Sequence, residues 1–400
     1  MADSPDRSFE ETVRRFQGFG QATLAFEDEG IPYHVNEFWT SRQRQAHALH
    51  EISYRACFKP QLPAFFIARL TRPGDLVYDP FMGRGTTPIE AALHGRRAAG
   101  NDINPLSVLL TRPRLRAVTP GEIARTLAGI DWERGESEDE ELLAFYSADT
   151  LRQISALKSW LGRTAPPDAI PAPAADWVRM VALNRLSGHS PGFFSVYTLP
   201  PNQAVSPAAQ RRINAQRGQS PPDRDVPALI LRKAKALLAD GAVPADTDFL
   251  LCTGPAARTP AIPDASVALV VTSPPFLDIV QYAADNWLRC WFASIPVAGM
   301  AIAAHRTETA WQAMVRETLE ELARIVRPGG HVAFEVGEVR KGSVLLERLV
   351  WEAAAGLPFE RMFVMVNSQE FTKTANCWGV RNNAGGTNSN RIVLLRRREQ

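Results

Sequence analysis

The chain has 400 residues, of which 45% are hydrophobic and 22% are charged, and its formal net charge is +2. This length accommodates one large α/β domain with an insertion, or two domains. A net charge so close to zero excludes a basic surface over the whole molecule, so any nucleic-acid-binding surface has to come from local clusters of lysine and arginine.

The four cysteines are far apart and form no CxxC or Cys/His pattern at metal-ligand spacing. This argues for a reducing compartment and against structural zinc, and we expect no metal. The N-terminal sequence MADSPDRSFEE is polar and acidic, unlike a signal peptide, and no apolar run approaches the roughly 20 residues of a membrane span. We therefore expect a cytoplasmic protein.

In chain order, residues 1–35 are polar and are expected to form a loosely held lead-in. Residues 36–70 alternate basic and aromatic side chains and then become an amphipathic helix. Residues 75–105 follow the pattern of a strand at 76–78, a glycine-containing turn, a helix at 86–94 and a second strand at 97–100. This order is typical of half of a doubly wound α/β sheet.

The sheet pattern is interrupted over residues 112–245, where helical segments are expected near 120–130, 139–161, 175–187, 207–216 and 226–239. Strands resume at 247–253 and 266–272, followed by a helix at 308–326 and strands at 331–339, 361–367 and 391–397. We predict a doubly wound, mostly parallel, seven-stranded Rossmann-like sheet formed by residues 36–111 and 246–400. A helical subdomain at 112–245 is inserted into it.

The segment DPFMGRGTT (79–87) places Gly83 and Gly85 between a strand and a helix, where glycine permits a tight turn and close approach of a ligand. It has no third glycine at position 88 and no Gly-Lys-Ser/Thr, so neither a dinucleotide nor a nucleoside triphosphate is favoured. The next strand ends at Asp102, which is suited to accept both hydroxyls of a ribose. Two other interpretations are that Asp102 caps a turn with Asn104 and that Asp79 caps the following helix.

The segment VVTSPPFLD (270–278) is an apolar strand that stops on two prolines. Neither proline can donate a backbone hydrogen bond, so the strand cannot continue. Taken alone, this is as consistent with a rigid turn as with a functional loop.

Together, DPFMGRGTT, NDINP (101–105), TSPPF (272–276) and FKPQLPAFFI (58–67) resemble the amino-directed DNA methyltransferases, which use S-adenosyl-L-methionine to methylate N4 of cytosine or N6 of adenine. The resemblance covers residues 58–110 and 246–340. It implies double-stranded DNA as substrate, a nucleoid-associated location and, in some members, a cognate restriction endonuclease for the same site. The cofactor-binding residues that it implies are Phe58, Lys59, Pro60, Asp79, Pro80, Phe81, Gly83, Gly85, Thr86, Thr87, Asp102, Ile103, Asn104 and Ser273.

The catalytic residues implied by the resemblance are Ser273, Pro274, Pro275 and Phe276. An exocyclic amine is a poor nucleophile because its lone pair is delocalised into the ring. The Ser273 hydroxyl and the Pro274 carbonyl would accept its hydrogens and aim the lone pair at the methyl group, while Phe276 stacks on a base flipped out of the duplex. A C5-cytosine enzyme would need a Pro-Cys pair, which is absent. Serine at the first position favours N4 of cytosine over N6 of adenine, the alternative.

Residues 211–235 contain seven Lys or Arg against two Asp, which favours phosphate contact or, alternatively, a solvated helix face. A second basic cluster lies near residues 42–59, and residues 372–391 are either a hairpin loop or part of the base-reading surface. The candidate DNA-binding residues are Arg42, Arg44, Arg211, Arg212, Lys233, Lys235, Arg381 and Asn382.

The sequence departs from the family where Arg84 replaces a small residue and where the third strand ends in Cys252-Thr253-Gly254-Pro255. Two alternative functions are an RNA or protein-amide methyltransferase and a non-catalytic nucleic-acid-binding protein. Serine at position 273 and the large insertion count against the first of these. The intact SPPF segment counts against the second.

Overall fold

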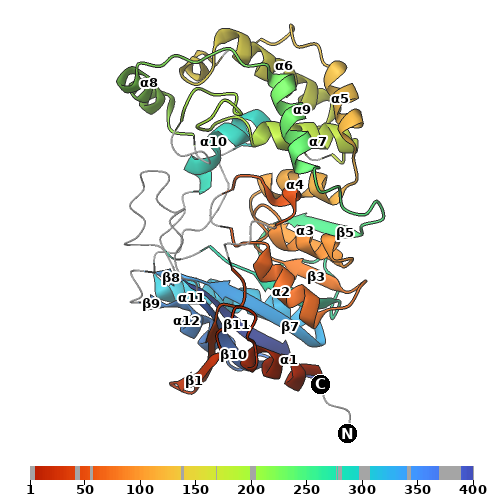
Figure 1. Ribbon diagram of the computed structural model, residues 1–400, viewed down its shortest axis with the longest axis vertical. Coiled ribbons are helices and arrows are strands. Elements are labelled where there is room, and N and C mark those ends of the chain that lie inside the picture. Colours follow the sequence, from red (N-terminus) through yellow and green to blue (C-terminus); the bar gives the residue numbers. More distant parts are fainter. Residues whose placement is uncertain are drawn as a thin grey trace.

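The computed structural model describes residues 5–40, 46–54, 57–136, 139–167, 169–198, 204–275, 277, 282–296, 307–339, 344–368 and 389–399. Its main sheet has nine strands in the order β1-β2-β10-β11-β7-β6-β3-β4-β5 (Figure 1). These strands are β1 (Leu24–Asp28), β2 (Ile31–Asn36), β3 (Leu76–Asp79), β4 (Arg97–Asp102), β5 (Phe249–Thr253), β6 (Val267–Thr272), β7 (Val326–Val336), β10 (Phe359–Ser368) and β11 (Ser389–Arg397). The short strands β8 (Glu338–Val339) and β9 (Val344–Leu345) form a separate pair.

The strands from β7 to β5 pair in parallel, whereas β11 is antiparallel to both of its neighbours, β7 and β10. β3 and β6 are buried along their whole lengths, as expected for strands that are covered on both faces of a parallel sheet. The predicted doubly wound, mostly parallel α/β fold is confirmed. The sheet has nine strands where the sequence predicted seven.

The two additional strands come from the N-terminal segment, and the prediction of a loosely held lead-in is wrong for its described residues. β2 pairs in parallel with β10, and β1 continues the sheet as an antiparallel partner of β2. Helix α1 (Pro5–Arg14) places Phe9 and Val13 in the core, with Phe9 stacked on Phe363. The spacing of Phe9 and Val13 puts both on one helical face, a signal that the polar composition obscured.

Helices cover both faces of the sheet. Helices α2 (Gln61–Leu70) and α3 (Thr86–Leu93) pack on one face together with α1, and α11 (Glu308–Ile325) and α12 (Leu346–Ala353) pack on the other. Residues of β6 divide between these two cores: Leu269 and Val271 face the first, and Val267 and Val270 belong to the second. From Leu269 to Val271 the division follows the two-residue period of a strand, and an irregularity in register between Val267 and Leu269 brings Val267 to the same side as Val270.

A helical lobe lies between β4 and β5 in the chain and forms the upper part of Figure 1. Its helices are α5 (Pro120–Ala128), α6 (Ala148–Thr164), α7 (Pro173–Leu183), α8 (Pro207–Arg217) and α9 (Val226–Leu237). The chain reaches it through α4 (Leu106–Thr111) and a short 3-10 turn at Arg112–Leu115. Two more 3-10 turns are found elsewhere, at Ala48–His50 and Glu140–Ala144. A buried ion pair between Arg112 and Asp176, 2.6 Å between Nε and Oδ2, fixes α7 to this connection.

Helix α10 (Tyr282–Ala293) follows β6 in the sequence but packs on the helical lobe. The Trp287 indole donates to the Ala204 carbonyl at 2.8 Å, and Arg289 donates to the carbonyls of Leu183 and Ser53. The lobe is thus built from the segment in which the sequence predicted the insertion together with a helix that comes after β6.

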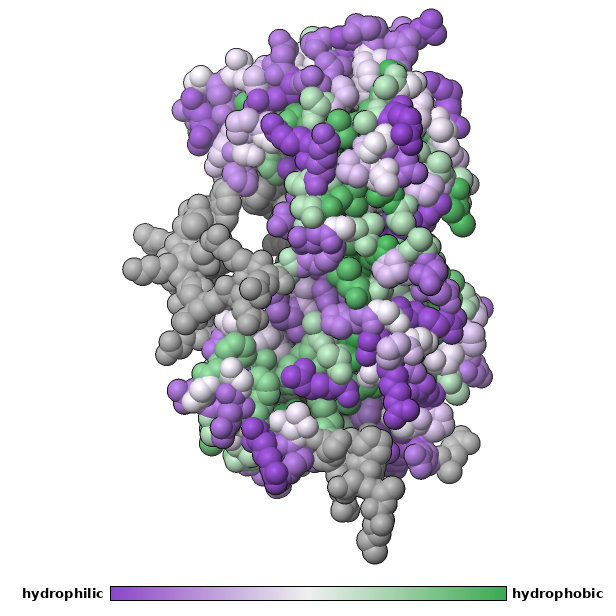
Figure 2. Space-filling view, turned by 45° about the vertical axis from the view of Figure 1, so that its right-hand side comes forward, coloured by the Kyte–Doolittle hydropathy of each residue, from purple (hydrophilic) through white to green (hydrophobic). Residues whose placement is uncertain are grey.

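Hydrophilic residues dominate the outer end of the lobe, whereas hydrophobic residues gather in the middle of the same face, between lobe and sheet (Figure 2). Within the residues that the structure describes, no helix has both the length and the apolar character needed to cross a membrane.

Candidate functional site

Three neighbouring strands of the sheet, β6, β3 and β4, end at one edge with the residues that the sequence singled out. Ser273 follows β6, the glycine turn follows β3, and Asp102 is the last residue of β4. The strands are parallel, so their carboxyl ends meet at this edge, which is where doubly wound folds bind ligands. The structure therefore brings the predicted cofactor turn, ribose acid and catalytic loop together.

The glycine turn requires glycine at both of its positions. Gly83 and Gly85 have φ of 51° and 78°, a region that other residues rarely adopt. A Cβ atom on Gly85 would lie 2.3 Å from Oγ1 of Thr111, so the side chain of Thr111 occupies the space that any other residue would need.

Asp102 connects the glycine turn to the tip of β4. Its Oδ2 accepts the Gly83 N–H at 2.8 Å, and its Oδ1 accepts the Asn104 N–H at 2.8 Å. The second contact is the turn cap that the sequence offered as an alternative role. Burial raises the pKa of this carboxyl, and the two backbone hydrogen bonds oppose the rise. Beside it, the apolar side chain of Ile103 is 39% exposed.

Arg84, which departs from the family pattern, holds a separate segment against the turn. Its guanidinium donates to three backbone carbonyls, those of His50, Ile52 and Phe58. A Cβ atom on Gly83 would lie 3.4 Å from the Tyr54 ring and 3.6 Å from Cys57 Sγ. The predicted residues Phe58 and Pro60 thus lie near the turn on a segment that Arg84 fixes, and Lys59 between them is exposed. Tyr54, which the sequence analysis missed, lies on the same segment and packs against the turn at Gly83.

Asp79 lies beneath the turn and is fully buried. Its Oδ1 accepts the Thr272 hydroxyl at 2.6 Å and the Phe81 N–H at 3.0 Å, so it does not cap the following helix as the sequence suggested. Burial raises the pKa of Asp79 to about 7. The neighbouring Thr87 is also buried and donates to the Val271 carbonyl at 2.9 Å. Asp79 and Thr87 therefore tie the turn to β6 from within the core.

Ser273 lies beside a buried carboxylate that the sequence analysis did not identify. Thr272 pairs with Phe334 in the register of β6 and β7, which makes the next residues, Ser273 and Glu335, neighbours. Glu335 is only 4% exposed. Burial raises the pKa of Glu335, and hydrogen bonds from the Ser273 hydroxyl and the Asn390 amide, the latter at 2.9 Å, oppose the rise.

The prolines of the loop are held from the opposite side. Pro274 is buried, Pro275 is half-buried, and the indole of Trp311 donates to the Pro275 carbonyl at 2.8 Å. Phe276 lies outside the described residues.

Of the candidate DNA-binding residues, Arg211 and Arg212 are exposed on α8, and Lys235 is exposed in the last turn of α9. Lys233 is half-buried, and its Nζ lies 3.7 Å from the Glu51 carboxylate. Arg42, Arg44, Arg381 and Asn382 lie outside the described residues.

Residues 21–111 match the model of a DNA methylase family whose members act on N6 or N4. The chain is 32% identical over 96 residues to the type II methyltransferase M.MvaI of Kocuria varians, and 36% identical over 75 residues to the type II methyltransferase M.MjaII of Methanocaldococcus jannaschii. These matches show that part of the chain is similar to the amino-directed DNA methyltransferases. These alignments cover 23% and 19% of the chain, and they span only 21% and 14% of the relatives' own lengths.

Solved methyltransferase structures give weak overall superpositions. TrmN from Thermus thermophilus covers 86% of this chain and 50% of its own, with 13% identity and a TM-score of 0.34. A putative DNA modification methylase, also from Thermus thermophilus, covers 37% of this chain and 53% of its own, with 22% identity and a TM-score of 0.24.

Proposed function

We propose that this chain is a DNA methyltransferase that transfers a methyl group from S-adenosyl-L-methionine to N4 of a flipped cytosine in duplex DNA. The observation that carries the proposal is the convergence of Ser273, the glycine turn and Asp102 at the ends of three adjacent strands. A base-binding loop and a nucleoside-binding turn are thereby placed side by side. The relationship to amino-directed DNA methyltransferases supports this assignment.

The residues at this edge fit S-adenosyl-L-methionine. Asp102 accepts one backbone hydrogen bond on each oxygen and a further side-chain hydrogen bond from Ser107, which leaves one of its roughly four acceptor positions for a ribose hydroxyl. The exposed side chain of Ile103 offers an apolar surface to an adenine ring. When bound, the cofactor supplies a methyl group on a sulfonium, which is electrophilic without any contribution from the protein.

Ser273 and Pro274 position the target amine. The Ser273 hydroxyl donates to Glu335, so its oxygen lone pairs remain free to accept from the amino group. The Pro274 carbonyl accepts the second amino hydrogen. Formation of the N–C bond, with cleavage of the methyl–sulfur bond, would leave the nitrogen positively charged, and it would have to lose a proton. Ser273 takes this proton and passes its own to Glu335, a carboxylate whose raised pKa favours the protonated form.

Cytosine is the proposed base because a neutral serine, and not Asp or Asn, begins the loop. The alternative is N6 of adenine, whose amine can be held by the same two acceptors. The helical lobe is the proposed target-recognition region, and a restriction endonuclease for the same site is the partner that this function would have.

The test is transfer of tritiated methyl groups to duplex DNA, RNA and protein by the purified chain, followed by nucleoside mass spectrometry. We expect incorporation into duplex DNA as N4-methylcytosine. N6-methyladenine would refute the choice of base, and labelling of RNA or protein alone would refute DNA as the substrate. Ser273→Ala should lose most of the turnover while it still binds the cofactor. Near-normal turnover in that variant, with the fold intact, would remove the catalytic assignment.

A further inference from the structure

A group of cationic side chains meets at the inner side of the helical lobe, away from the glycine turn and the SPPF loop. Arg185 follows α7, Arg232 and Lys233 lie on α9, and Arg289 lies on α10. The sequence analysis named only Lys233 of these four. The group is formed by two helices, α9 and α10, and by the segment that follows α7, which are distant from one another in the sequence.

The space around Gly192 shows how closely two of these cations approach. A Cβ atom on Gly192 would lie 3.8 Å from Nη1 of Arg185, 3.8 Å from Nη2 of Arg232 and 3.5 Å from Oγ of Ser190. Two guanidinium groups and a hydroxyl therefore surround one point that has no side chain of its own. Arg185 is further fixed by its guanidinium, which stacks 4.1 Å from the centroid of the Phe193 ring.

The negative charge nearby is small. Among the ion pairs of the described residues, Lys233 pairs with Glu51, at 3.7 Å, and the Glu51 side chain is 65% exposed. Arg185 and Arg232 pair with no described carboxylate. Burial first, and then the charges of Arg232 and Arg289, lower the pKa of Arg185 to about 10. Burial and then Arg185 likewise lower the pKa of Lys233. Like charges held together in this way are a cost to the free protein that a bound anion would offset.

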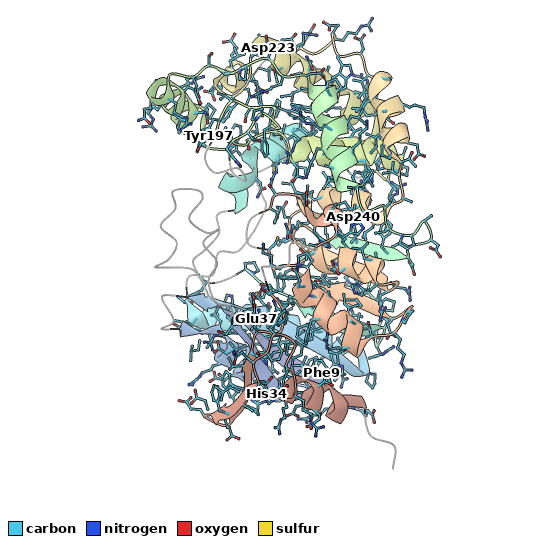
Figure 3. The ribbon with its side chains drawn as sticks, in the orientation of Figure 1. Phe9, His34, Glu37, Tyr197, Asp223 and Asp240 are labelled. Atoms are coloured by element: carbon cyan, nitrogen blue, oxygen red, sulfur yellow. The ribbon has the colours of Figure 1, made fainter. Side chains whose placement is uncertain are left out.

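The group is anchored to the candidate active site through one short segment. Ser53 donates its N–H to Asn184 Oδ1 at 3.0 Å, and its carbonyl accepts from Arg289 at 2.9 Å. On the other side, Arg84 of the glycine turn donates to the carbonyls of His50 and Ile52. Asp240, labelled in Figure 3 where the chain leaves α9 near the sheet, accepts the Ala48 N–H at 2.8 Å and closes this segment. An anion held by the group would thus have a defined position relative to the turn.

We propose that Arg185, Arg232 and Lys233, with the hydroxyl of Ser190, bind a backbone phosphate of duplex DNA. Guanidinium groups match the geometry of phosphate oxygens, and a phosphate contact positions the duplex without reading its sequence. This inference rests on the proposed function, because it takes its ligand from the substrate of that function. A free phosphate ion has the same chemistry, and the experiment separates the two sources.

The test measures binding of a fluorescent duplex to the wild-type chain, Arg185→Gln, Arg232→Gln and the double variant, between about 50 and 200 mM salt. Each single variant should bind DNA several-fold more weakly, and the double variant, which loses the contact to this one phosphate, should flatten the slope of log affinity against log salt by about one. The matched control is Arg72→Gln, an exposed arginine in the turn before β3, at the opposite edge of the sheet. It should leave the slope unchanged, and calorimetry should show unaltered cofactor affinity in all variants.

A second arm uses inorganic phosphate and thermal unfolding. Phosphate should raise the Tm of the wild-type chain and not that of the double variant. If the wild-type chain binds DNA and the double variant has the same salt slope, the inference is overturned, even if free phosphate still raises the Tm. If the wild-type chain neither binds nor methylates DNA, the proposed function fails instead. Loss of phosphate protection in the double variant would then still locate an anion site here.

Discussion

The indole nitrogen of Trp311, in the first turn of α11, donates a 2.8 Å hydrogen bond to the carbonyl oxygen of Pro275. Trp311 is fully buried and Pro275 is half-buried, so the donor end of this bond is shielded from water. Because Pro274 and Pro275 have no backbone N–H, the loop cannot fix its own conformation through donors. A donor from the neighbouring helix α11 holds the Pro275 carbonyl, next to the Pro274 carbonyl that we propose as an acceptor for the target amine.

Replacement of Trp311 by Phe should therefore slow methyl transfer by up to about tenfold, the equivalent of roughly 1.4 kcal/mol. The ring would still fill most of the space, while the donor would be lost. Single-turnover kinetics on duplex DNA and cofactor calorimetry are the measurements. Trp287→Phe is the matched control, because its indole donates to the Ala204 carbonyl within the lobe. Equal effects of the two variants on turnover would show that the Trp311 bond has no special role.

The Glu335→Gln variant should lose the pH dependence of kcat that the Glu335 carboxylate confers. Burial raises the pKa of Glu335, and only the ionised form can accept a proton from Ser273, so wild-type kcat should rise as the pH passes through this raised pKa. Because the glutamine side chain is neutral at every pH, kcat of this variant should be about 100-fold lower and flat. Glu335→Asp should retain the dependence. A wild-type pH profile in Glu335→Gln would exclude Glu335 from proton transfer.

Asp102→Ala should weaken cofactor binding by roughly 1.5–3 kcal/mol, the scale of a hydrogen bond to a charged group. The change removes a ribose acceptor and also releases the Gly83 and Asn104 N–H groups. Isothermal titration calorimetry measures the change. Asp248→Ala is the control, because Asp248 pairs with Arg97 at the other end of β4. Unchanged affinity in Asp102→Ala would mean that the carboxylate acts only within the protein.

Asp79→Asn should reduce the loss of stability at high pH. The pKa of Asp79 is about 7 in the folded chain, against an ordinary value of 3.8 for an aspartate exposed to water, so the folded state binds the proton more tightly. The contribution of this tighter proton binding to the free energy of unfolding is fully present below about pH 4. It is lost as the pH rises through about 7, by at most roughly 1.4 kcal/mol per pH unit. Asparagine keeps the Oδ1 acceptor for Thr272 and has no charge to bury. Urea unfolding at pH 5 and pH 8 should therefore show a smaller difference in the variant, and an equal difference would contradict the assignment.

The central strands and the glycine turn were predictable because their signals are local. β3, α3 and β4 follow one another within residues 76–102, and their apolar runs, glycines and terminal acid are read directly from the sequence. The N-terminal hairpin was missed because β1 is exposed along its whole length and contains Glu27 and Asp28. Its place in the sheet depends on pairing between β2 and β10, which are at opposite ends of the chain.

The residues that support the site were not predictable, because their contacts also join distant parts of the chain. Glu335 reaches Ser273 only through the register of β6 and β7, and Trp311 reaches Pro275 through the packing of α11. The motif drew attention to Asp79, but its burial beneath Thr272 is a property of two paired strands. Arg185 follows the apolar α7 in the sequence, and its stacking on Phe193 and its approach to Arg232 beside Gly192 are visible only in the folded chain.

The path of the chain after β6 connects the sheet to the helical lobe. Pro275 is tethered to the sheet side through Trp311, and Trp287 and Arg289 of α10 are tethered to the helical lobe. Pro275 and α10 are close together in the sequence but are thus fixed to different parts of the molecule, the first to α11 on the sheet and the second to the helical lobe.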